Sequence, residues 1–152
     1  MEAPLCNAIA IGEFTPWARQ LFNEWQSEGL VHLAFEPSIN QFVQSIVRPG
    51  ESRIVILENT SQSHLNLAQI RASNRSLLVL FLGQRFLIDD LKCALQYKVF
   101  GVLENPSISD KNALHLFQKA QLSIDRKNQN QLLIQSLKNL ILQTEPTAAN
   151  EV

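Results

Sequence analysis

Carboxylate and amide side chains stand where three apolar runs of this sequence end. Glu13 follows the first run, Glu58 closes a later one, and the pair Glu104 and Asn105 follows the run that precedes Pro106. Such runs are typical of buried strands, and in an open α/β sheet the carboxyl ends of the strands are the usual place for chemistry. Carboxylate oxygens gathered at one edge are ligands that Mg²⁺ accepts. The first hypothesis is therefore a site at the strand ends.

Other kinds of catalytic or cofactor site lack their sequence patterns. A phosphate-binding loop needs closely spaced glycines, whereas the turn after the first run holds Gly12 alone, and no Walker sequence or Gly-x-Ser-x-Gly elbow occurs. The two cysteines, Cys6 and Cys93, are far apart, which favours reduced thiols packed in the protein. No two histidines have ligand spacing, so we expect no metal site and no cofactor. The histidines are His32, His64 and His115.

Composition places the chain among ordinary soluble proteins. Its 152 residues suffice for one domain with a sizeable core; 45% of them are hydrophobic, 18% are charged, and the net charge is −1. This balance argues against nucleic acid as a partner. No basic leader and no long apolar segment precede the first strand, so we expect neither secretion nor a membrane span. The expected location is the cytoplasm.

Five apolar runs alternate with helical patterns along the first two thirds of the chain. We expect strands within residues 7–14, 30–37, 52–59, 76–85 and 99–103, and helices within residues 15–29, 38–50, 63–74 and 86–98. Thr15 is the expected cap of the first helix, and Pro16 stands at its first position. The third and fourth runs lack polar alternation, as strands covered on both faces do. The pattern predicts an α/β domain, a doubly wound parallel (βα)5 sheet.

The end of the chain departs from this alternation. Neither Gly nor Pro occurs between Pro106 and Pro146, which predicts a long helix. Residues 125–131 are polar on every face, whereas residues 132–142 are apolar again and need a partner. The leucines of this seam, in a spacing of four and then three, are Leu133, Leu137 and Leu140. A coiled-coil homodimer is the expected partner, and a separate helix folded back on the domain is the alternative.

These patterns divide the chain into three expected parts. The first is a domain over residues 1–124, and the second is an extended helix or short coiled coil over residues 125–143. The third, residues 144–152, is expected to be a disordered tail.

One stretch resembles a known family. Residues 94–106, ALQYKVFGVLENP, are similar to the Ala-Leu…Gly-Ala…Tyr-Leu-x-Lys-Pro stretch of the receiver domains of two-component response regulators, and the resemblance extends from Asn7 to about Ile124. It implies a flavodoxin-like (CheY-like) strand order, 2-1-3-4-5. In that family two acids after the first strand hold Mg²⁺, an aspartate after the third accepts a phosphoryl group, and a hydroxyl residue and a lysine follow the fourth and fifth strands.

The matching positions of this chain depart from the family pattern. Gly12 and Glu13 replace the acid pair, and Glu58 replaces the phosphoacceptor; the other three positions hold Leu82 for the hydroxyl, Val102 for the aromatic switch and Asn105 for the lysine. The resemblance therefore implies a pseudo-receiver, a signalling domain without enzymatic activity that is not phosphorylated. Glu58 is then either an inert glutamate or a mimic of the phosphoryl group. An atypical receiver that is still phosphorylated remains an alternative.

By the same resemblance the domain works through a protein partner in a bacterial signalling pathway. The implied contact face comprises the fourth helix, fifth strand and fifth helix, with Asp90, Lys92, Gln96, Tyr97, Ser107, His115 and Gln118. A further alternative is a small-molecule sensor on the same fold. Its pocket at the strand ends would be lined by Trp17, Glu13, Glu58 and Gln84.

Overall fold

The protein contains a five-stranded parallel sheet with helices on both faces. The structure, a computed structural model, describes residues 6–44, 53–106 and 111–150, with side chains as far as residue 143. The strands are β1 (Cys6–Ile11), β2 (Val31–Glu36), β3 (Ile54–Glu58), β4 (Leu78–Gly83) and β5 (Gly101–Glu104). Their order is β2-β1-β3-β4-β5, and every neighbouring pair is parallel. The predicted flavodoxin-like order is confirmed.

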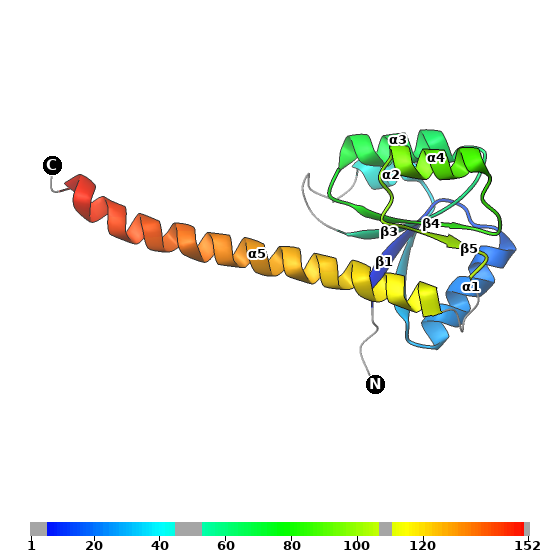
Figure 1. Ribbon diagram of the computed structural model, residues 1–152, viewed down its shortest axis with the longest axis horizontal. Coiled ribbons are helices and arrows are strands. Elements are labelled where there is room, and N and C mark those ends of the chain that lie inside the picture. The colour runs from blue at the N-terminus through cyan, green and yellow to red at the C-terminus, as the bar shows by residue number, and fades with distance from the viewer. Residues whose placement is uncertain (1–5, 45–52, 107–110, 151–152) are drawn as a thin grey trace. The chain divides into compact units, whose positions relative to one another are not determined.

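The helices follow the strands in strict alternation and form two layers (Figure 1). They are α1 (Pro16–Ser27), α2 (Ile39–Gln44), α3 (Ser63–Ser73), α4 (Ile88–Gln96) and α5 (Lys111–Asn150). Helices α2, α3 and α4 cover one face of the sheet, whereas α1 and the first turns of α5 cover the other. The predicted second helix extended to residue 50, but residues 45–52 lie outside the described ranges.

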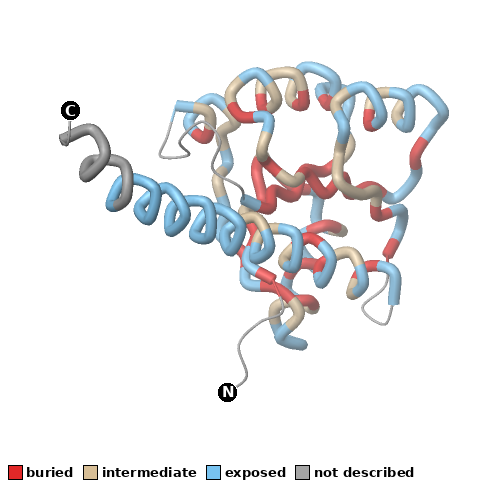
Figure 2. The backbone as a smooth tube through the Cα atoms, turned by 60° about the vertical axis from the view of Figure 1, so that its left-hand side comes forward, coloured by how far each residue is buried: buried red, intermediate tan, exposed pale blue. Residues whose placement is uncertain are grey.

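The core lies where both faces of the central strands meet these helices (Figure 2). Every residue of β3 is buried, and so is all of β4 after Leu78. This explains why their sequences show no polar alternation, because neither face of these strands meets water. On the α1 face, Trp25 is fully buried and its ring stands edge-on to Phe117 of α5, with centroids 5.1 Å apart.

Local signals fix where the first helix begins. Thr15 has an extended backbone, and its hydroxyl accepts a hydrogen bond from the backbone N–H of Ala18 at 3.3 Å. Pro16 occupies the first helical position, where its missing N–H costs nothing. Both predictions for this helix start are confirmed, and the cap brings the Thr15 side chain to the end of the sheet where β1 finishes.

The chain divides into two units, residues 1–121 and residues 122–152. The first contains the sheet and the first turns of α5, in which Ala113, Phe117 and Ala120 are buried. The second is the remainder of α5, whose helical backbone continues to Asn150. Residues 144–150 are therefore helical where the sequence predicted a disordered tail. This segment contains Pro146, which removes one backbone hydrogen bond from the helix, whereas residues 148–149 are alanines, the strongest helix formers.

None of the helices among the described residues combines the length and the apolar content that a membrane crossing requires.

Candidate functional site at the strand ends

Glu13 lies just beyond the end of β1, and its side chain forms no hydrogen bond with another described residue. The loop that carries it turns at Gly12, where φ is +106°, a value that L side chains rarely adopt. The Gly12 N–H donates to the carbonyl of Glu36 at 2.8 Å, which ties this loop to the end of β2. Glu13 itself is exposed, so its carboxylate is solvated rather than held in a defined position.

Glu58, at the end of β3, is buried, and both of its carboxylate oxygens accept hydrogen bonds from Thr15. Its side chain is only 7% exposed. One carboxylate oxygen accepts the backbone N–H of Thr15 at 3.0 Å, and the other accepts the Thr15 hydroxyl at 2.7 Å. Thr15 caps α1, so the carboxylate also lies near the N-terminus of that helix, where negative charge is favourable. In the described structure Glu58 fastens the β1–α1 loop to the sheet.

Leu82 and Gly83 form the end of β4 beside Glu58. Leu82 pairs with Glu58 on one side and with Leu103 on the other, and it is completely buried. A Cβ added at Gly83 would lie 3.0 Å from the Phe86 ring, so that ring would have to shift by a few tenths of an ångström to admit a side chain. The predicted hydroxyl position is thus occupied by a core leucine, which offers no hydrogen bond to a ligand.

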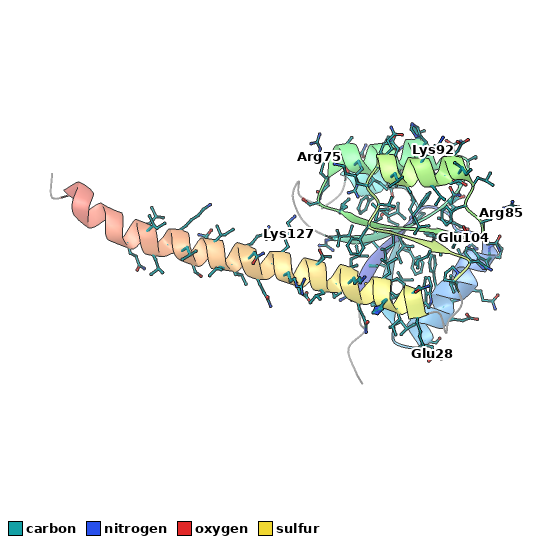
Figure 3. The ribbon with its side chains drawn as sticks, in the orientation of Figure 1. Glu28, Arg75, Arg85, Lys92, Glu104 and Lys127 are labelled. Carbon is teal, nitrogen blue, oxygen red and sulfur yellow. The ribbon has the colours of Figure 1, made fainter. Side chains whose placement is uncertain are left out.

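Residues at the end of β5 form hydrogen bonds with the loop that follows β4. Asn105 has a φ of +42°, which asparagine tolerates better than most residues, and its N–H donates to the carbonyl of Gly83 at 2.7 Å. The Glu104 carboxylate accepts the N–H of Phe86 at 3.2 Å. Val102, at the predicted switch position, is half-buried in β5. Figure 3 shows Glu104 and Arg85 at this end of the sheet.

A hollow of about 420 Å³ opens at the same edge, between the ends of β1 and β3 and helices α2 and α3. Glu13 and Glu58 line it, as predicted for a sensor pocket, but Trp17 and Gln84 do not. Their absence follows from topology, since Trp17 lies in α1, on the sheet face opposite α2 and α3, and Gln84 follows β4, one strand further along. No lysine or arginine is among its described lining residues, whereas amide side chains are frequent: Asn40, Gln62, Asn66 and Gln69.

These residues do not fit the magnesium ion that the resemblance to receiver domains implies. A Mg²⁺ site needs several oxygen ligands in near-octahedral positions. Glu13 is one free carboxylate, but Glu58 is already bonded through both oxygens to Thr15. The described residues also contain no group of three or more His, Cys, Asp or Glu placed to hold a metal. We therefore derive no step through a metal at this edge.

The predicted contact face lies along the β5 edge of the sheet. On α4, Lys92 and Gln96 are exposed, and the half-buried Asp90 accepts the N–H of Leu87 at 2.8 Å. His115 and Gln118 are exposed on the first turns of α5. Ser107 lies outside the described residues.

Tyr97, the remaining described residue of this face, belongs to a small cluster with α3. It ends α4, and its hydroxyl lies 3.0 Å from Nε2 of His64. The two rings stand edge-on with centroids 5.1 Å apart, and the Cys93 thiol is 3.8 Å from Nδ1 of the same histidine. Half-burial, with the nearby Asp90 carboxylate, raises the pKa of Cys93. The cluster joins α3 to α4 rather than presenting Tyr97 freely to a partner.

Sequence reasoning missed the most exposed apolar surface of this face. Only Ala94 is buried among the residues of α4. The α4 strip, as we name these four exposed side chains with their exposed fractions, comprises Leu87 (58%), Ile88 (73%), Leu91 (43%) and Leu95 (79%). Their helical spacing was visible in the sequence, but such spacing ordinarily marks the side that packs on the core. Nothing in the pattern distinguishes a buried stripe from an exposed one.

The second unit carries its own exposed apolar stripe. The predicted seam residues Leu133, Leu137 and Leu140 are 58%, 50% and 59% exposed. Ile134 and Ile141 lie next to them on the helix and are about half exposed, so the stripe is broader than three leucines. Leu132 and Leu142 are exposed beside it.

No protein-family model and no curated protein matches this chain. Solved structures do share its fold. The signal receiver domain of an HD domain-containing protein from Pseudomonas fluorescens Pf-5 is 17% identical, with a TM-score of 0.61 over 82% of this chain and 99% of that one. A signal receiver domain of a histidine kinase from Clostridium thermocellum is 12% identical, with a TM-score of 0.56 over 76% of this chain and 96% of that one.

A third similar structure is a pilus assembly protein, CpaE, from Caulobacter crescentus CB15. It is 13% identical, with a TM-score of 0.53 over 77% of this chain and 94% of that one. Identities this low establish a shared fold and nothing more. The fold is that of receiver domains, the flavodoxin-like arrangement that the strand order already defines.

Proposed function

We propose that this chain is a non-catalytic signalling domain, a pseudo-receiver that is not phosphorylated and acts by protein contact. The observation that carries the proposal is Glu58, whose two carboxylate oxygens are both bonded to Thr15 in a buried position. A nucleophile must present a free oxygen to the phosphoryl donor, and this one is committed to holding a loop. The proposed setting is a bacterial signalling pathway in the cytoplasm.

The electrostatics of the site support the same function. Phosphoryl transfer depends on positioning and on neutralising the charge of the phosphoryl oxygens. The hollow beside Glu58 has no cationic side chain among its described lining residues, and Asn105 stands where the family has its lysine. Among these described residues a phosphoryl group would meet the Glu13 carboxylate and no compensating cation. Glu58 as a permanent mimic is less well supported, because Thr15 satisfies it locally.

Exposed apolar side chains supply the proposed contact surfaces. The α4 strip is a contiguous run of large side chains on an outer helix, and such patches on soluble proteins commonly mark interaction sites. We place the partner contact on the α4–β5–α5 side, with Lys92 and Gln96 at the rim of the strip. The seam around Leu137 is the proposed homodimer contact.

Phosphorylation is the direct test. The full chain is incubated with acetyl phosphate and Mg²⁺, with an active receiver domain in parallel as the positive control, and intact mass is measured. We expect no added phosphoryl group on this chain. A mass increase of one phosphoryl group that disappears in Glu58→Gln would refute the pseudo-receiver and establish the atypical active receiver instead.

Dimerisation is tested by analytical ultracentrifugation over a range of concentrations. Burying a leucine stabilises by roughly 1.5–3 kcal/mol, so six seam leucines in two chains outweigh the ordering of a short helix and give about micromolar dissociation. The double variant Leu133→Gln and Leu137→Gln should be monomeric. Leu132→Gln with Leu142→Gln, the same two changes made beside the stripe, should remain dimeric. A wild-type chain that is monomeric throughout would exclude the homodimer.

A further inference from the structure

A second hollow, of about 530 Å³, opens at the opposite edge of the sheet, where the strands begin. It lies between the α3–β4 loop and the α4–β5 loop. Arg71, Arg75 and Lys98 line it together with Tyr97 and Phe100, and its described lining includes no aspartate or glutamate. Figure 3 shows Arg75 at this end, away from Arg85 and Glu104. We name it the basic hollow.

Arg71 is the fixed part of the basic hollow. Its Nε donates to the carbonyl of Tyr97 at 2.7 Å, and Nη2 donates to the carbonyl of Lys98 at 2.7 Å. Nη1 donates to the carbonyls of Leu77 at 2.6 Å and Arg75 at 3.3 Å. A guanidinium has five N–H donors, so these bonds leave one unused. The acceptors are carbonyls, which carry a partial negative charge but no formal one, so none of these four bonds pairs the guanidinium with an anion.

None of the contacts just described pairs Arg71 with a counter-charge. Arg71 is half-buried, and desolvation lowers its pKa from the ordinary value. A nearby anion would act in the opposite direction, because it favours the charged form. The site thus contains a pre-oriented cation whose desolvation is not offset by a carboxylate among the contacts just described.

The net charge of the basic hollow favours an anion. Arg75 and Lys98 are exposed and add two positive charges to that of Arg71. The C-terminal ends of α3 and α4 face the same region, and each contributes about half a negative elementary charge. Three cations less about one negative charge leave roughly +2, which matches a doubly charged anion. By contrast, the hollow at the other edge of the sheet is lined by two carboxylates and no cation among its described residues.

The walls and the volume favour a small organic molecule over a bare ion. The rings of Tyr97 and Phe100 are both half-buried and line the hollow beside its cations. A cavity of this volume lies within the range of small-molecule sites, which combine apolar walls with a few placed polar groups. We propose that the basic hollow binds a small organic phosphate, with the phosphate among Arg71, Arg75 and Lys98 and a planar apolar part against the two rings.

The test uses the full chain, amide NMR titration and three matched probes: AMP, adenosine and inorganic phosphate. AMP should shift the amides of residues 75–78 and 96–100 and bind at least tenfold more tightly than either of the other two. Its affinity should fall as salt is raised, because the contact is between charges. If adenosine binds as well as AMP, the anion site is wrong. If inorganic phosphate binds as well as AMP, or if AMP shifts nothing at millimolar concentration, the organic phosphate is refuted.

Two exposed residues allow the site to be changed without unfolding the protein. Lys98 has a φ of +53°, so Lys98→Asn removes the charge with a residue that tolerates this conformation. Combined with Arg75→Gln, it should weaken AMP binding at least tenfold. The control Lys92→Gln with Lys119→Gln removes the same two charges from exposed positions of α4 and α5 outside the hollow, and it should change the affinity less than twofold. Equal losses in both proteins would show that only overall charge matters and would overturn the proposal.

Discussion

Replacing Thr15 by valine tests whether Glu58 is held as the structure describes. Thr15→Val keeps the shape of the side chain and removes its hydroxyl, which both caps α1 and donates to the Glu58 carboxylate. Loss of the cap costs about 1 kcal/mol, and loss of a hydrogen bond to a charged group costs about 1.5–3 kcal/mol. Thr15 is exposed, so water replaces part of the second loss. We expect the free energy of unfolding to fall by about 2–3 kcal/mol.

The assay is urea unfolding followed by tryptophan fluorescence. Both tryptophans, Trp17 and Trp25, lie in the first unit, so the signal reports on that unit alone. Thr15→Ser keeps the hydroxyl and should cost less than about 0.5 kcal/mol. The same pair of measurements in a Glu58→Gln background completes a double-mutant cycle.

The coupling energy from that cycle shows whether the Glu58 carboxylate is bonded to Thr15. Groups in direct contact couple by about 0.5–3 kcal/mol, and we expect about 1 kcal/mol between the Thr15 hydroxyl and the Glu58 carboxylate. If the effects of Thr15→Val and Glu58→Gln are simply additive, the carboxylate is not committed to Thr15. That result would remove the main support for an inert Glu58 and restore the phosphoryl mimic as a serious alternative.

Three further outcomes follow from the packing. Burial raises the pKa of Cys6 to about 12, above its unfolded value of 9.0, so the protonated thiol stabilises the fold fully below pH 9. The free energy of unfolding should therefore fall between pH 9 and 12 in wild type, and it should fall less in Cys6→Ala. Urea midpoints measured across this pH range check the difference. Gly101→Ala should cost about 1 kcal/mol, because the new methyl collides with Leu116, and Leu116→Ala should cost less in that background. Leu95→Lys should leave stability within about 0.5 kcal/mol of wild type in the same assay, since Leu95 is 79% exposed; a core-sized loss would refute that exposure.

Local sequence signals predicted the framework well because they act over a few residues. The apolar runs that became β3 and β4 needed no long-range information, since a strand covered on both faces is apolar throughout. Thr15 and Pro16 likewise predict a helix start, because a threonine side chain can cap the helix and proline suits the first helical position. The strand order then followed from the resemblance to receiver domains, and the sheet confirms it.

The missed features depend on contacts between distant segments. Glu58 and Thr15 are 43 residues apart, and no spacing rule connects them. The α4 strip was missed because helical periodicity shows which residues share a face but not whether that face is covered. Arg71 was missed because its contacts, like that between Glu58 and Thr15, join distant parts of the sequence: two of the carbonyls it binds lie 26 and 27 residues further along the chain.

Arg71 also has a consequence for the order in which the protein folds. Two of its acceptors, the carbonyls of Arg75 and Leu77, are four and six residues away, so these bonds can form as soon as α3 turns into β4. The carbonyls of Tyr97 and Lys98 arrive only after β4 and α4 are in place. Contacts between distant residues form late because loop closure must precede them. The later pair of bonds should therefore slow unfolding more than it speeds folding, and the two loops joined by Arg71 should open as one cooperative unit.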